Sequence, residues 1–84
     1  MILIDPPHVP RYDRWWSHVV SDTSFEELHV FAAELGIPDR GFHRDHYDLP
    51  AEWYDAAIAA GANPVTTREL VRALAASGLR RRKV

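Results

Sequence analysis

The sequence contains no cysteine, and this absence limits the sites that the chain can build. Disulfide bonds and thiolate metal ligands are both excluded. Any metal ion would have to be held by imidazole nitrogens and carboxylate oxygens, which suit Zn²⁺, Mn²⁺ or Mg²⁺. A chain without disulfides fits a reducing compartment, so we expect a cytoplasmic protein.

Long apolar runs are missing as well. No stretch approaches the ~20 residues of a membrane-spanning helix, and the apolar start at residues 1–4 is too short for a signal peptide, so we expect no membrane contact. The net charge is only −2, although residues 80–83 are all basic. We expect this tail to be disordered, and any contact with nucleic acid would have to be made through it, because the rest of the chain is acidic. Composition does not determine the oligomeric state.

The 84 residues, of which 46% are hydrophobic, predict one globular domain over residues 1–79. Short strands are predicted near residues 2–5, 17–21 and 64–66, and the pattern allows a further strand near 42–47. Residues 6–14 contain three prolines and predict a loop. With three helices between and after these strands, we predict an α/β domain whose mixed or parallel sheet of three to four strands is covered by the helices.

The helix boundaries are marked by capping residues. The first helix begins at a capping box, formed by Ser24 with Glu27 or by Thr23 with Glu26, and it ends at Gly36. The second runs from about residue 50 to residue 60, and the third begins where Thr66 and Glu69 form another capping box. His29 follows Phe25 by one turn, so we expect it to face the sheet, partly buried and hydrogen-bonded.

Residues 42–49 combine two imidazoles, two carboxylates, a guanidinium and a phenol with apolar side chains, which is the usual composition of a ligand pocket. If this segment is extended, Phe42, Arg44, His46 and Asp48 share one side. Asp48 could then fix the tautomer of His46, as carboxylates do at metal sites. Alternatively, Asp48 caps the helix that begins near Pro50.

Three other polar residues stand out elsewhere in the chain. His18 lies on a strand with apolar residues on both faces, which predicts a central strand. It could be a ligand there or a neutral imidazole bonded to a backbone carbonyl. Asp5 ends the first strand, where it could serve a ligand or cap a turn. Arg68 lies in the first turn of a helix, where its positive charge interacts unfavourably with the helix dipole, at a cost of ~0.3–1 kcal/mol. It could bind an anion there with Thr66 and Thr67, or pair with a pocket carboxylate.

Several motifs together resemble a known family. They are Ile4-Asp5-Pro6-Pro7, Trp16-Ser17-His18, Asp22-Thr23 with Glu27-Leu28-His29, Asp45-His46-Tyr47-Asp48, and Gly61-Ala62 with the run from Pro64 to Leu70. The chain resembles the small bacterial and phage proteins of domain-of-unknown-function family 4031 up to about Leu79. That family has no assigned activity, so the resemblance implies a shared domain and no particular chemistry.

We therefore predict a pocket that binds a small anionic ligand, phosphate-like or nucleotide-like. The candidate metal ligands are His18, His46 and Asp48, and the candidate catalytic residues are Asp5, His46 and Asp48. The candidate ligand-binding residues are His18, Tyr47, Thr66, Thr67 and Arg68, and we expect His18, His46 and Arg68 to border one cavity. The alternatives are a metal-dependent hydrolase or nuclease, with a divalent ion such as Zn²⁺ or Mg²⁺, and a structural or interaction module without a small-molecule site.

Overall fold

The computed structural model describes residues 1–79, so the predicted basic tail at 80–84 lies outside the described residues. The helices are α1 (Phe25–Leu35), α2 (Tyr54–Ala59) and α3 (Thr67–Ser77). The strands are β1 (Ile2–Ile4), β2 (Val9–Arg11), β3 (Arg14–Ser21), β4 (Phe42–His43), β5 (His46–Pro50) and β6 (Asn63–Pro64). None of the helices within residues 1–79 has the length and apolar character needed to cross a membrane.

The strands form one mixed sheet around β3, in the order β4-β5-β3-β1-β6, with β2 also paired to β3. β3 runs antiparallel to β1, β2 and β5, while β1 and β6 are parallel. The predicted α/β class, the mixed sheet and the central position of the strand that carries His18 are confirmed. The sheet has more strands than predicted.

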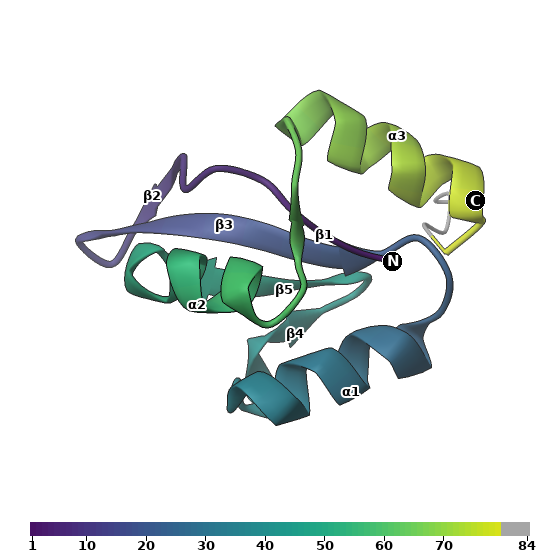
Figure 1. Cartoon of the computed structure of the whole chain (residues 1–84). Helices are drawn as coiled ribbons and strands as arrows, with labels where there is room; N and C mark the ends of the chain where they lie inside the picture. The colour runs from purple at the N-terminus through teal and green to yellow at the C-terminus, as the bar shows by residue number, and fades with distance from the viewer. Residues whose placement is uncertain (80–84) are drawn as a thin grey trace.

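Helices cover both faces of the sheet (Figure 1). α1 and α2 pack against one face, around a core that includes Val19, Tyr47 and Leu49. α3 packs against the other face through Leu70 and Leu74, which meet the sheet residues Leu3 and Val20. Because these contacts lie at one end of β3, the side chains farther back along the same face of β3 are left for the site.

Local signals marked the helix starts well. The hydroxyl of Ser24 accepts from the backbone N–H of Glu27, and Thr66 and Glu69 form a complete capping box. Gly36 ends α1 with a φ of 88°, a conformation that glycine adopts without a Cβ clash. The second helix is shorter than predicted, because residues 51–53 form a 3-10 turn before α2 begins.

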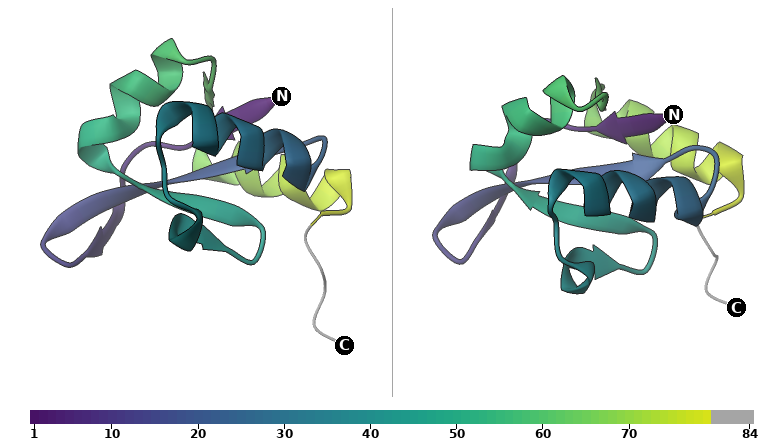
Figure 2. Two further views of the ribbon diagram at one scale, coloured as in Figure 1. Left: turned by 90° about the horizontal axis from the view of Figure 1, so that it is seen from below. Right: turned by 60° about the horizontal axis from the view of Figure 1, so that its bottom comes forward.

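Two segments fold as hairpins, which the sequence pattern did not predict. The predicted loop at 6–14 contains β2 and a two-residue turn into β3, visible as the projecting end of the sheet in Figure 2. The segment at 42–48 turns at Arg44 and Asp45, which pairs Phe42 with Tyr47 and His43 with His46. Phe42 therefore packs on Tyr47, at a ring distance of 5.3 Å, and not beside His46.

Ser17 and Ser21 offer a matched test of polar burial on β3. Both are buried, but within residues 1–79 the Ser17 hydroxyl has no hydrogen-bond partner. The Ser21 hydroxyl donates to Glu27 at 2.5 Å and accepts from the backbone N–H groups of Thr23 and Ser24. An unpaired buried hydroxyl costs stability, whereas a paired one stabilises its neighbours.

We predict that Ser17→Ala raises the free energy of unfolding by about 1 kcal/mol and that Ser21→Ala lowers it by about 1–3 kcal/mol. Urea denaturation of both variants beside the parent protein checks this. Equal destabilisation by the two changes would contradict it.

Candidate metal centre

The carboxylate of Asp5 organises the site. β1 stops at Ile4, because Pro6 and Pro7 follow and neither can donate a ladder hydrogen bond. Asp5 is fully buried, and its Oδ1 accepts from the backbone N–H of His18 at 2.6 Å. Its Oδ2 accepts from His18 Nδ1 and from the Thr67 hydroxyl, both at 2.9 Å. Burial alone would raise the pKa of Asp5, but these donors outweigh it and lower the pKa.

Asp5 fixes the tautomer of His18. Since Nδ1 carries the hydrogen that it donates to the carboxylate, Nε2 of the neutral ring carries none and has its lone pair available. This is the arrangement of a metal-ligating histidine with its outer carboxylate partner. With three donors on its two oxygens, buried Asp5 is placed to orient His18 and not to take a proton from a substrate.

His46 has a carboxylate at each ring nitrogen. Nδ1 lies 2.8 Å from Asp45 Oδ1, and Nε2 lies 3.2 Å from Asp48 Oδ1. Burial alone would lower the pKa of His46, but the hydrogen bonds to Asp48 and Asp45 outweigh it and raise the pKa above 6.5. The same bond to His46 lowers the pKa of Asp48, despite its burial. Asp48 therefore pairs with an imidazole and does not cap α2.

The sheet register brings these groups together. His18 on β3 lies opposite Asp48 on β5, and His46 lies two residues before Asp48 on the same face. The rings of His18 and His46 are 5.1 Å apart. One potential ligand atom from each of His18, His46 and Asp48 lies within 4.8 Å of the other two, close enough to hold one ion. Asp5, His8 and His18 form a second such group.

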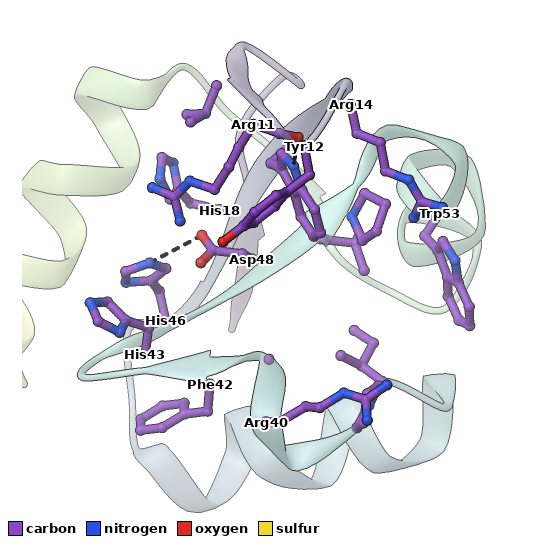
Figure 3. A pocket seen from close by; sticks show the side chains of 17 residues that line it. Arg11, Tyr12, Arg14, His18, Arg40, Phe42, His43, His46, Asp48 and Trp53 are labelled. Carbon is purple, nitrogen blue, oxygen red and sulfur yellow. Dashed lines mark hydrogen bonds and ion pairs between the residues drawn. The ribbon is translucent and has the colours of Figure 1, made fainter.

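These side chains open onto a cavity of about 790 Å³ (Figure 3). Its lining includes three guanidinium groups, from Arg11, Arg14 and Arg40. Arg14 is paired with Glu52 at 3.0 Å. The hydrogen bond to His46 is the main cause of the lowered pKa of Asp48, and the charge of Arg11 adds to it. The cavity thus combines a potential metal centre with positive charge.

Four of the predicted ligand-binding residues lie outside this cavity. Tyr47 is fully buried on the α1 side, so it cannot contact a ligand there. Thr66 caps α3, and the Thr67 hydroxyl is bonded to Asp5. The prediction that Arg68 borders the cavity with His18 and His46 is wrong: Arg68 is exposed. Successive helical residues point about 100° apart, so when Thr67 faces Asp5, Arg68 points elsewhere.

His29 only partly matches its prediction. Its Nδ1 lies 2.7 Å from the Tyr47 hydroxyl, so the expected hydrogen bond is present. The residue as a whole is exposed, however, because it lies at the edge of the helix face that α1 buries. This histidine belongs to the face opposite the cavity.

Sequence reasoning missed His8, Arg11 and Asp45. The His8 ring lies 5.4 Å from that of His18, and its Nδ1 donates to the Pro6 carbonyl at 2.7 Å. In a straight strand Asp45 and His46 would point to opposite sides, so the strand pattern did not link them. The two central residues of the turn are Arg44 and Asp45, and they lack the glycine or asparagine that usually signals a two-residue hairpin.

A comparison with protein families matches residues 2–77 to the family described as protein of unknown function, DUF4031. The chain belongs to the DUF4031 family. Comparisons with curated proteins and with solved structures gave no match. The family match confirms the resemblance seen in the motifs, and the function of this DUF4031 protein must be argued from its own geometry.

We predict that in the metal-free protein His46 titrates above pH 6.5 and that Asp48→Asn lowers this pKa. Since protonated His46 favours the folded state, its contribution to stability is fully present below pH 6.5 and is lost as the pH rises through the folded-state pKa. NMR titration of the imidazole resonances checks the shift, with Asp55→Asn on the exposed side of α2 as the control. A His46 pKa at or below 6.5 would contradict the predicted pairing.

Proposed function

We propose that this protein binds a divalent transition metal ion, Zn²⁺ in the first place, through His18, His46 and Asp48. The observation that carries the proposal is that each histidine ring is hydrogen-bonded to a carboxylate through Nδ1. Asp5 holds Nδ1 of His18 and Asp45 holds Nδ1 of His46, at 2.9 and 2.8 Å. Both rings therefore have Nε2 left for an ion, and such outer carboxylates are the common partners of metal-bound histidines.

The donor set favours Zn²⁺ over Mg²⁺. Two imidazole nitrogens and one carboxylate oxygen suit zinc, while magnesium prefers oxygen ligands and retains its waters. Nε2 of His46 lies 3.2 Å from Asp48 Oδ1, so the two atoms that pair with each other here are the ones that would bind the ion. Three protein ligands leave a coordination position open for water or a ligand.

We further propose that the open position holds a small phosphate-like or nucleotide-like anion. Arg11, Arg14 and Arg40 line the same cavity as the three ligands. A guanidinium group binds phosphate through two parallel N–H···O hydrogen bonds. A bound divalent ion would add positive charge to the site and so favour an anion there. A cytoplasmic location, with its phosphorylated metabolites, remains our expectation.

We predict that metal-depleted protein binds one Zn²⁺ and that His18→Ala, His46→Ala or Asp48→Ala each weaken binding more than Asp45→Asn does. Loss of an outer carboxylate costs about 10–100-fold in affinity, and loss of a ligand should cost more. Isothermal titration calorimetry checks this order, with His29→Ala as a control histidine on the other face of the sheet. Wild-type affinity in His46→Ala would overturn the proposal.

Hydrolysis of a phosphate ester is the second candidate function, and His8 is the observation that favours it. Its Nδ1 is held by the Pro6 carbonyl, its side chain is 42% exposed, and its ring stands beside that of His18. This leaves Nε2 of His8 available as a general base toward water at the metal. Asp5 lacks this freedom, since it is fully buried and accepts from three donors.

If the protein is a hydrolase, we predict that His8→Ala lowers kcat toward bis(p-nitrophenyl) phosphate by about 10²–10⁴-fold, the usual contribution of a general base. Zinc affinity should stay unchanged, because His8 lies outside the proposed ligand set. Steady-state kinetics on the zinc-loaded protein check the rate. Absence of turnover with zinc bound would leave the anion-binding function and reject the hydrolase.

A further inference from the structure

The hairpin formed by β2 and β3 presents aromatic rings that the fold does not bury. Its turn residue Tyr12 is 83% exposed, and Trp15 is 54% exposed. The hairpin extends away from the helices as the far end of the sheet (Figure 2). Neither ring packs against another aromatic ring within residues 1–79, in contrast to the histidines at the centre of the site, whose rings meet edge to face. An exposed ring such as that of Tyr12 is available to contact another molecule.

The two residues at the centre of the turn, Tyr12 and Asp13, do not favour the backbone conformation that they adopt. Tyr12 and Asp13 both have positive φ, 54° and 58°, as the two central residues of a type I′ turn do. Glycine and asparagine favour this conformation, whereas a bulky residue such as tyrosine is strained in it. A tyrosine held there is better explained by what its ring contacts than by what its backbone contributes.

Two aromatic rings of the hairpin reach the cavity of the proposed metal centre. Tyr12 and Trp16 both line it, together with Arg11. The indole of Trp16 is fixed by a hydrogen bond from Nε1 to the Arg11 carbonyl at 2.8 Å. Figure 3 shows Arg11 and Tyr12 projecting from the hairpin toward the side of the sheet that carries His18 and Asp48. Trp15 points to the opposite face, since side chains alternate along a strand.

We propose that the ligand of this site is a nucleotide, whose base stacks on Tyr12 and Trp16 while its phosphate lies at the metal and Arg11. The proposal rests on the metal centre proposed above and adds the base to it. An aromatic ring beside a guanidinium is the combination that binds bases and phosphates together. A sugar phosphate without a base would leave the aromatic side of the cavity empty.

The charge of the domain favours a short ligand. Its acidic side chains outnumber its basic ones within residues 1–79, which disfavours a long nucleic acid backbone. The positive charge of the cavity is local, from Arg11, Arg14 and Arg40. A free nucleotide and the end of a single strand present the same chemistry to it.

The test compares adenosine 5′-monophosphate with ribose 5-phosphate, which lacks only the base, on zinc-loaded protein by isothermal titration calorimetry. We expect the nucleotide to bind about ten- to a hundredfold more tightly, the usual contribution of base stacking. Tyr12→Gly should remove most of this ratio while leaving the affinity for ribose 5-phosphate unchanged. Glycine suits the positive φ, so this variant should fold with an unchanged or raised Tm.

Trp15→Ala is the matched control, because it removes an exposed aromatic ring from the opposite face of the same hairpin. It should leave both affinities unchanged. Arg68→Ala controls for charge, since Arg68 is exposed and outside the cavity. A short single-stranded oligonucleotide, titrated beside the mononucleotide, distinguishes a strand end from a free nucleotide by which of the two binds more tightly.

The outcomes separate this inference from the function on which it rests. Equal affinity of the wild-type protein for the two phosphates overturns the base site, even when zinc and phosphate bind. A ratio that Tyr12→Gly leaves intact also overturns it. If zinc does not bind but the nucleotide retains its Tyr12-dependent advantage, the metal centre fails and the base site stands.

Discussion

The rest of the structure depends on the hydrogen bonds that the buried carboxylate of Asp5 accepts. A charged group with no exposed surface is tolerated only when its oxygens are satisfied by donors. Here the donors come from the central strand and from the start of α3, through His18 and Thr67. One side chain thus ties β1 to β3 and to the last helix, and in the same contacts it orients an imidazole of the site.

The division of the sheet faces explains why a site lies beside Asp5. α1 and α2 cover one face completely enough to bury Tyr47 and Leu49. α3 covers only the end of the other face, where it packs on Leu3 and Val20. His18 and Asp48 lie beyond that helix, partly exposed at the cavity wall, where His18 is bonded to Asp5 and Asp48 is paired with His46. A longer α3 packed along the whole sheet would have required apolar residues at those positions.

Much of the fold could be predicted because its signals are local. Capping side chains marked the starts of α1 and α3, and glycine marked the end of α1, since these residues satisfy backbone groups within one turn. The pairing of His46 with Asp48 was also predictable from the period of a strand. The hairpins were not, because Tyr12-Asp13 and Arg44-Asp45 lack the glycine or asparagine that usually marks a two-residue turn.

The sequence by itself determined the chemistry available to this protein: histidines and carboxylates without thiols, a central strand carrying His18, and a segment where His46 and Asp48 share a face. Only the tertiary structure decided which of these groups meet. The register of β3 against β5 placed His18 opposite Asp48, and the turn at residue 45 gave His46 a second carboxylate. The orientation of α3 brought Thr67 to Asp5 and left Arg68 outside the cavity. Such contacts join residues far apart in the chain, and their geometry depends on how strands and helices pack, which no local pattern specifies.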